Sequence, residues 1–241
     1  MSSTAGPSTA DTRTLAQRVV GRLSDLTIAN LLPSKSANLR QCARDDMWDV
    51  YFREAEGQFH EQWVGTIRPL IEDFDFETVL ELSPGAGRNT EKLSELTSRL
   101  IAVDYNQQPL EQTKARLDAL GTRCEITYHQ NNGCDLRMVD DASVTAIYCW
   151  DSAVHFDKSV LSAYIREFAR VLKPGGSGFL HHSDLGDRAH KSIKRNSHWR
   201  SNVSKELVAE QCRVNGLTVV RQQPVPWPPI VDCATIFRKD L

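Results

Sequence analysis

The sequence predicts an α/β protein with a doubly wound, mostly parallel sheet of seven strands. From Thr78 onward, short apolar runs alternate with longer stretches of helical spacing, as a doubly wound sheet requires. The first apolar run, residues 79–82, leads directly into a glycine loop. With 241 residues, 40% of them hydrophobic, the chain is long enough for one domain with a substantial core.

The strands are expected in order along the chain, with helices between most of them. The expected strands cover residues 78–82, 100–103, 124–129, 144–150, 177–183, 217–223 and 232–237. The expected helices cover residues 88–97, 107–119, 158–172 and 203–215. The run Lys-Pro-Gly-Gly at 173–176 is a usual stop signal for the helix before it.

Residues 1–70 are predicted to form an N-terminal helical arm or lid, and residues 71–241 the catalytic domain. Residues 1–12 are rich in serine, threonine, glycine and proline, and residues 14–32 carry apolar side chains at helical spacing. A second amphipathic stretch, residues 45–70, is rich in aromatic side chains. This stretch is expected to pack on the sheet, to close over the ligands, or to do both.

Composition limits the partners that can be expected. The formal net charge of −2 gives no basic field, so neither nucleic acid nor an anionic membrane is expected, and a small-molecule substrate is favoured. No apolar run approaches about 18 residues, and the start lacks the pattern of a signal peptide, so a cytoplasmic location is expected. The six cysteines form no Cys-x-x-Cys pair and are read as reduced thiols. A homodimer is left open.

The glycine loop carries an acid just before its turn, and that acid indicates the class of ligand. Gly85 and Gly87 allow a sharp turn and close approach of a ligand to the backbone. A dinucleotide fingerprint would need a small residue at Thr90, and Glu81 would repel a pyrophosphate. The loop therefore favours a cationic ligand. Asp104 ends the second strand 19 positions after Gly85, a spacing that fits a carboxylate binding ribose hydroxyls.

These residues resemble the class I S-adenosylmethionine-dependent methyltransferases over residues 78–237. Later landmarks follow in the order of that family, at residues 132–136, 147–151 and 172–176. The resemblance implies a Rossmann-like sheet with S-adenosyl-L-methionine across the carboxyl ends of the first strands. It assigns cofactor binding to Glu81, Ser83, Gly85, Ala86 and Gly87, to Asp104 and Tyr105, and to Asn132, Gly133 and Cys149.

Two strand ends carry candidate catalytic residues. Asp151 and His155 follow the fourth strand, and His181 and His182 stand at the end of the fifth. A neutral imidazole can accept a proton near neutral pH, so His155 is the first choice as general base, oriented by Asp151. Neighbouring side chains of one strand face opposite ways, so one histidine of the pair is expected to reach the site, and His182 is chosen.

A divalent metal is an alternative role for the first pair. Asp151 and His155 could ligate a cation with a second acid, and some methyltransferases with an acid-and-histidine motif here bind one. In this chain Val154 replaces the second carboxylate of that motif, so no metal site is predicted.

The polar, basic segment 185–203 is predicted to be a substrate lid. An aromatic ring beside a guanidinium can stack on a flat or sugar-like ligand and bond its hydroxyls, which favours Trp199 and Arg200 as substrate-binding residues. Asp184 and Tyr51 are added to them. Residues 178–186, with 198–200 and 231–233, resemble a subset of the family associated with saccharide O-methylation.

The sequence thus predicts an S-adenosylmethionine-dependent O-methyltransferase acting on a hydroxyl of a small polar acceptor, a sugar or glycoside. The alternatives are methylation of a carboxylate, phenol or amine of a secondary metabolite, a non-catalytic cofactor-binding regulatory protein, and a dinucleotide-dependent oxidoreductase.

Overall fold

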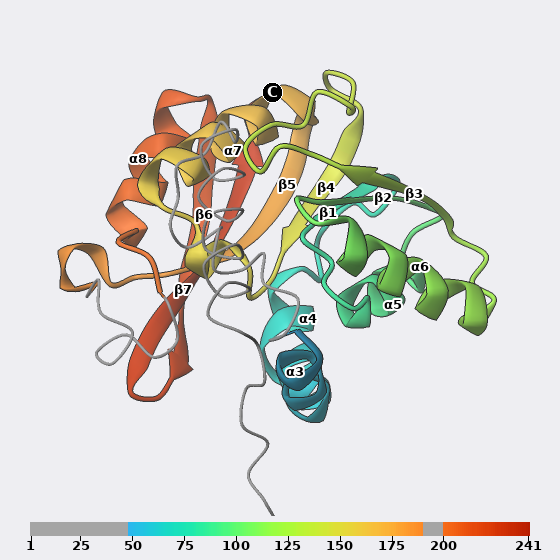
Figure 1. Ribbon diagram of the computed structural model, residues 1–241. Coiled ribbons are helices and arrows are strands. Elements are labelled where there is room, and N and C mark those ends of the chain that lie inside the picture. Colours follow the sequence, from blue (N-terminus) through green and yellow to red (C-terminus); the bar gives the residue numbers. More distant parts are fainter. Residues whose placement is uncertain (1–47, 190–199) are drawn as a thin grey trace, which may run out of the picture.

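A single seven-stranded sheet forms the centre of the protein (Figure 1). The computed structural model describes residues 48–189 and 200–241, so the predicted helix at 14–32 lies outside the described residues. The strands are β1 (Val79–Leu82), β2 (Arg99–Asp104), β3 (Glu125–Gln130), β4 (Val144–Cys149), β5 (Leu172–His182), β6 (Leu217–Trp227) and β7 (Ile230–Lys239).

The sheet order is β3-β2-β1-β4-β5-β7-β6. Strands β1 to β5 pair in parallel, whereas β7 runs antiparallel between β5 and β6. The order reverses beside β1, which is the place where an open α/β sheet forms its ligand crevice, at the carboxyl ends of the strands. The predicted doubly wound, mostly parallel fold is confirmed.

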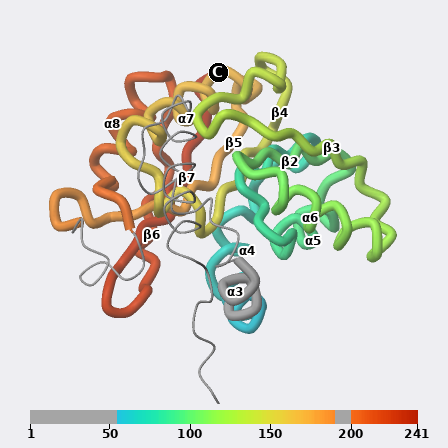
Figure 2. The backbone as a smooth tube through the Cα atoms, viewed as in Figure 1, coloured from blue at the N-terminus to red at the C-terminus, as the bar shows by residue number. Residues whose placement is uncertain are grey.

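Helices connect the strands and cover both faces of the sheet (Figures 1 and 2). The helices are α3 (Trp48–Gln62), α4 (Arg68–Leu70), α5 (Arg88–Ser94), α6 (Gln107–Leu120), α7 (Lys158–Val171) and α8 (Lys205–Val214), with a π-helical turn, η2 (Trp63–Ile67), between α3 and α4. One core cluster joins α7 and α8 to the sheet, and a second joins α3, η2, α5 and α6 to it. Both faces are thus covered, so the central strands β1 and β4 are buried at every position rather than at alternate ones.

The C-terminal hairpin is longer than the sequence predicts. The expected strand 217–223 continues to Trp227, through two prolines whose Cα atoms pair with Cys233 and Val231 of β7. Proline is tolerated here because β6 is the edge strand, where one side of the backbone needs no ladder hydrogen bonds. As a result, the hairpin extends past the carboxyl end of β5, where β7 pairs with His181 and His182.

The described part of the N-terminal arm packs on the sheet. Phe59 and Trp63 are buried in the second core cluster with side chains of β1, β4 and β5. Arg88, at the start of α5, lies over the Phe59 ring at 5.8 Å. The arm therefore touches the glycine loop region as well as the sheet. Within the described residues, no helix has the length and apolarity needed to cross a bilayer.

Candidate active site

The glycine loop after β1 turns through three left-handed residues. Ser83, Gly85 and Gly87 have φ values of 59°, 62° and 83°. A Cβ added at Gly87 would lie 3.1 Å from the backbone of Thr113 in α6, so the loop and that helix are in close contact. The Thr113 hydroxyl donates to the Gly85 carbonyl at 2.8 Å, which fixes the loop. Ser83 stands in the left-handed region without being glycine, a conformation that costs about 1–2 kcal/mol.

Two desolvated carboxylates lie at the carboxyl ends of β1 and β2. Burial raises the pKa of Glu81 to about 8, despite the Thr90 hydroxyl that lowers it, and Asp104 adds to the rise. Burial likewise raises the pKa of Asp104 to about 7. The Oε2 atom of Glu81 is buried and has no hydrogen-bond partner among the described residues. A buried unpaired acceptor is unfavourable unless a ligand supplies a donor or a positive charge.

Asp104 is positioned by the turn that follows it. Its Oδ1 accepts from the backbone N–H of Asn106 at 2.8 Å, and its carbonyl accepts from the N–H of Asn131 at 2.9 Å. Tyr105, beside it, is about half-buried, and burial raises the pKa of its hydroxyl. The acid and the tyrosine predicted to bind ribose thus stand together at the edge of the sheet.

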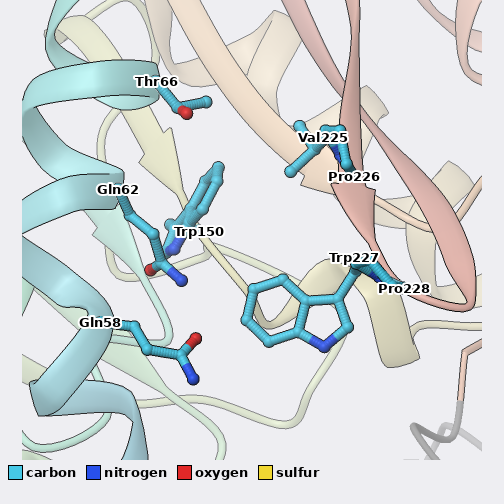
Figure 3. A pocket seen from close by; sticks show the side chains of 8 residues that line it. All are labelled: Gln58, Gln62, Thr66, Trp150, Val225, Pro226, Trp227 and Pro228. Atoms are coloured by element: carbon cyan, nitrogen blue, oxygen red, sulfur yellow. The ribbon is translucent and has the colours of Figure 1, made fainter.

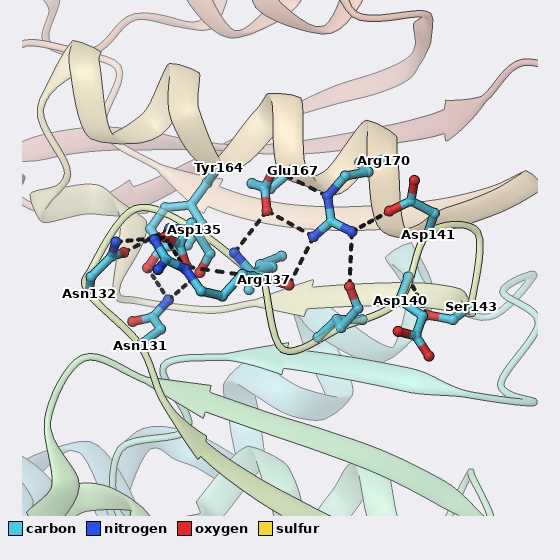
Figure 4. Close-up of polar contacts among 12 residues, drawn as sticks. Asn131, Asn132, Asp135, Arg137, Asp140, Asp141, Ser143, Tyr164, Glu167 and Arg170 are labelled. Atoms are coloured by element: carbon cyan, nitrogen blue, oxygen red, sulfur yellow. Dashed lines mark hydrogen bonds and ion pairs between the residues drawn. The ribbon is translucent and has the colours of Figure 1, made fainter.

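The loop after β3 is tied to α7 by a network of polar contacts (Figure 4). Asn131 donates to the Tyr164 hydroxyl at 2.8 Å, and Arg170 donates to the carbonyls of Leu136 and Val139, each at 2.9 Å. Asn131 bonds Tyr164 through its side chain and the Asp104 carbonyl through its backbone N–H, so the network holds the loop beside Asp104.

The two loop residues predicted to bind cofactor have different surroundings. The Oδ1 atom of Asn132 accepts from the N–H groups of Cys134 and Asp135, so its side chain closes its own turn. Gly133 has a φ of 83°, and its N–H donates to Asn131. Cys149 is fully buried in the first core cluster, where burial raises the pKa of its thiol to about 12. Cys149 therefore contributes its backbone and packing rather than a reactive thiol.

Asp151, just past β4, is surrounded by positive charge. It is buried and has a φ of 56°. Arg88 and Arg200 approach its carboxylate oxygens at 3.5 and 3.7 Å. Its backbone N–H donates to the Nδ1 atom of His181 at 3.1 Å. Asp151 thus joins the start of α5, next to the glycine loop, to the end of β5.

Asp232 at the start of β7 completes this buried cluster. The Nε atom of Arg200 donates to the Oδ2 atom of Asp232 at 2.8 Å, and the guanidinium lies over the Trp227 ring at 5.5 Å. Burial opposes the charge of Asp232, but His181 and Arg200 outweigh it and hold the pKa of the acid below its ordinary value. Arg200 is 4% exposed and Asp232 is fully buried, so this ion pair is shielded from solvent.

The two adjacent histidines of β5 point to opposite faces, as predicted, but His181 rather than His182 faces Asp151. Because the Nδ1 atom of His181 accepts the backbone N–H of Asp151, the ring N–H is on Nε2, which lies 3.6 Å from Asp232. The Nδ1 atom of His182 donates to the Ser183 carbonyl and its Nε2 accepts from the Thr235 hydroxyl. Burial also lowers the pKa of His182 to about 4. Because both ring nitrogens are hydrogen-bonded within the protein, His182 has a structural role.

The remaining predicted residues are placed as follows. His155 ends a short 3-10 turn, η3 (Ala153–His155), and is half-buried. Asp184 accepts from the N–H of Lys205 at 2.8 Å, at the start of α8. The structure describes only the backbone of Tyr51, within α3, and Trp199 lies outside the described residues.

The base of segment 185–203 is closed by hydrogen bonds. The N–H of Gly186 donates to the Val203 carbonyl at 2.8 Å, and the Ser183 hydroxyl donates to the Ser201 carbonyl at 2.8 Å. The N–H of Ser201 also donates to the carbonyl of Val154, next to His155, at 2.8 Å. The segment therefore starts and ends beside the candidate catalytic residues.

Sequence reasoning missed Asp232, His181 and Arg88 as members of the site. An acid inside the apolar run 230–237 was the available signal for Asp232, since buried acids need a charged partner. The described residues contain no cluster of three or more histidine, cysteine or acidic side chains arranged to hold a metal ion.

The residues at the carboxyl edge fit S-adenosyl-L-methionine. An orphaned Glu81 oxygen suits a cationic ligand, and Asp104 suits ribose hydroxyls. The fold and the site together resemble those of one class, the class I S-adenosylmethionine-dependent methyltransferases.

Comparison with known proteins supports that class. Residues 79–176 match a family model described as a methyltransferase domain, so this segment carries such a domain. The ubiquinone biosynthesis O-methyltransferase of Xanthomonas oryzae pv. oryzae (strain PXO99A) is 30% identical over 102 residues, covering 42% of this chain and 41% of that protein. The cypemycin N-terminal methyltransferase of a Streptomyces species is 31% identical over 123 residues, covering 51% of this chain and 46% of that protein. The chain thus spans less than half the length of these curated relatives.

Solved structures share the fold at low sequence identity. A Haloferax volcanii putative methyltransferase, in complex with the Trm112 methyltransferase activator, has a TM-score of 0.63 and 18% identity, covering 81% of this chain and 97% of that chain. Magnesium protoporphyrin IX methyltransferase from Synechocystis, solved with bound SAH, has a TM-score of 0.59 and 12% identity, covering 75% of this chain and 84% of that chain.

Proposed function

We propose that this protein is an S-adenosylmethionine-dependent methyltransferase that transfers a methyl group to a hydroxyl of a small polar acceptor. The observation that carries the proposal is the pair of desolvated carboxylates at the glycine loop, Glu81 with an orphaned oxygen and Asp104 beside it. A ligand with a positive charge and a vicinal diol satisfies both acids, whereas a dinucleotide offers a ribose diol to Asp104 but brings a pyrophosphate that Glu81 would repel.

Each residue of the edge has a part in holding the cofactor. When bound, S-adenosyl-L-methionine supplies an electrophilic methyl group and leaves as S-adenosylhomocysteine. Glu81 and the glycine loop hold the methionine end, Asp104 and Tyr105 hold the ribose, and the rigid loop at Asn132 and Gly133 covers the adenine. Transfer is a displacement in line with the leaving sulfur, so the protein mainly orients the acceptor and removes its proton.

His155 is proposed as the general base. Of the three histidines at this edge, His181 and His182 are fully buried, while His155 is half-buried and so open to a ligand. As the oxygen–methyl bond forms and the methyl–sulfur bond breaks, His155 accepts the hydroxyl proton. Asp151 acts as a positioning residue, since its carboxylate neutralises Arg88 and Arg200 at the base of the site.

Within this function, a sugar or glycoside is the acceptor proposed from the sequence. The named relatives include both an O-methyltransferase and an N-terminal methyltransferase, so an amine acceptor is the second candidate. In the structure Arg200 is engaged by two acids and Asp184 starts α8, so neither supplies a free charge for a substrate. Among the described residues, this engagement of Arg200 and Asp184 favours an acceptor recognised without an ion pair to either of them.

The test is transfer of labelled methyl from S-adenosyl-L-methionine to sugars, glycosides, phenols, amines and carboxylic acids, with and without a chelator. Label on a hydroxyl supports the proposal, and label on an amine or carboxylate supports the second candidate. Loss of activity with chelator would make Asp151 and His155 metal ligands. Cofactor binding without transfer to any acceptor would favour a non-catalytic role.

The role of His155 is tested by His155→Ala. This variant should keep the affinity for S-adenosylhomocysteine and lose most of the turnover, by about 100-fold or more, because general-base catalysis typically contributes that much. His60→Ala, at an exposed position of α3, is the matched control and should leave both quantities unchanged. Unchanged turnover in His155→Ala removes this residue from the mechanism.

A further inference from the structure

A pocket of about 360 Å³ opens between the N-terminal arm and the C-terminal hairpin (Figure 3). Side chains of α3 and η2 form one wall, the end of β6 forms the other, and Trp150 lies between them. The lining residues are Gln58, Gln62, Thr66, Trp150, Val225, Pro226, Trp227 and Pro228. Two segments far apart in the sequence thus build one pocket at the carboxyl edge of the sheet.

The walls of this pocket carry no charged side chain among the described residues that line it. Trp227 and the neighbouring prolines present apolar surface. The indole of Trp150 stacks on the His181 ring, with 4.2 Å between the ring centroids. The polar groups of the lining side chains are two carboxamides, one hydroxyl and two indole N–H groups. An ion would lose its hydration here without gaining a countercharge, so such walls favour an uncharged ligand with a flat or apolar face.

Two polar atoms of the lining residues are buried without a partner among the described residues. They are the Nε1 atom of Trp150, a donor, and the Oε1 atom of Gln62, an acceptor. Trp150 is 4% exposed, so water has little access to its N–H group. Figure 3 shows the Gln62 carboxamide beside the nitrogen edge of the Trp150 indole. A hydroxyl group both donates and accepts, so hydroxyl groups are suited to satisfy the two atoms.

The pocket adjoins the proposed catalytic edge. Trp150 directly precedes Asp151, and the Trp227 ring lies under the Arg200 guanidinium that pairs with Asp232. A ligand in the pocket would therefore stand next to the buried cluster at the end of β4 and β5.

We infer that this pocket recognises the acceptor as an uncharged, hydroxyl-bearing ring, with Trp150 and Gln62 bonding its hydroxyl groups. The inference rests on the proposed function and adds the substrate class: a neutral ring, rather than a carboxylate or an ammonium. Gln62 and Trp150 are specificity residues in this assignment, and the partly exposed Trp227 ring supplies stacking surface.

The experiment measures binding of small probes to the full chain saturated with S-adenosylhomocysteine. The neutral probes are catechol and methyl β-glucopyranoside, which separate an aryl ring from a sugar ring. The charged probes are benzoate and benzylamine. Analogues of the neutral probes that lack one hydroxyl group, such as phenol in place of catechol, report how much each hydroxyl group contributes to binding.

Two variants test the two atoms separately. Gln62→Leu removes the acceptor, and Trp150→Phe removes the donor while keeping an aromatic ring for stacking. Each variant should bind the neutral probe about fivefold to tenfold more weakly than the wild type does. Removing a hydroxyl group from the probe should reduce the affinity of the variant less than that of the wild type. Gln211→Leu, on α8 outside the pocket, is the matched control and should change nothing.

The outcomes separate this inference from the proposed function. Failure to bind S-adenosylhomocysteine at all would contradict the proposed function. With that ligand bound, the inference is overturned if charged probes bind as well as neutral ones, if no neutral probe binds, or if Gln62→Leu and Trp150→Phe bind neutral probes like the wild type. Should Trp150→Phe fail to fold, Gln62→Leu carries the test alone.

Discussion

Replacing Glu81 with glutamine keeps the size of the side chain and removes its charge, so it tests the carboxylate at the base of the glycine loop. Burial raises the pKa of Glu81 from an ordinary 4.5 to about 8. That difference corresponds to about 5 kcal/mol for ionising the group in the folded protein rather than in the unfolded chain. Because the pKa of Glu81 is raised in the folded state, the buried protonated carboxyl contributes its full stability below pH 4.5. This contribution to the free energy of unfolding is lost as the pH rises through 8.

The variant should therefore change stability and ligand binding in opposite directions. Relative to Glu81→Gln, the ligand-free wild type should lose free energy of unfolding from about pH 5 to about pH 8, by up to about 5 kcal/mol. The ammonium group at the methionine end of S-adenosylhomocysteine favours the ionised carboxylate, so wild-type affinity for this ligand should rise with pH over the same range. Glu81→Gln should bind about tenfold to a hundredfold more weakly, with a flatter pH dependence.

The assays are urea unfolding of the ligand-free proteins, and calorimetric titration with S-adenosylhomocysteine, at pH values of about 6, 7 and 8. Glu95→Gln, at an exposed position that caps α5, is the matched control and should follow the wild type. The reasoning is refuted if Glu81→Gln and the wild type show the same pH dependence of unfolding, or if the variant keeps full affinity.

Three further predictions concern the fold around the site. Ser83→Gly should raise the free energy of unfolding by about 0.5–1 kcal/mol, because glycine tolerates the φ of 59°; thermal unfolding measures this, and a lower midpoint contradicts it. Asp232→Asn should cost about 3 kcal/mol, since it leaves the Arg200 charge buried with less compensation, and adding Arg200→Met should recover much of the loss in urea unfolding. His182 has a lowered pKa of about 4, so its contribution is present above pH 6.5 and is lost as the pH falls through 4; His182→Gln should reduce this acid sensitivity in circular dichroism titrations, and an unchanged acid transition argues against it.

Much of the fold could be predicted because its signals are local. The seven strands and the helices between them follow from apolar runs, from Gly85 and Gly87 in the loop, and from the stop signal after α7. The length of β6 could not be predicted, because proline is a strand breaker except on an edge, and a single sequence does not reveal which strand is the edge.

The site divides in the same way between local and distant information. The positions of Glu81 and Asp104 near the ends of two strands are a local pattern, and the sequence predicts both residues from it. The choice between His181 and His182 depends on the phase of β5 relative to its neighbours, and one residue of phase reverses the faces. Asp232 joins Arg200 only because β7 inserts antiparallel beside β5, which is a long-range fact.

The closed base of segment 185–203 has a consequence for how the length of chain between its ends can change in evolution. Gly186 and Val203 are hydrogen-bonded to each other, and Ser201 is bonded to Ser183, so the entry and exit of the segment meet on the framework. Doubling the length of a flexible loop between fixed ends costs only about 0.6 kcal/mol. Insertions between those ends are therefore expected to cost the sheet and the cofactor-binding edge little stability.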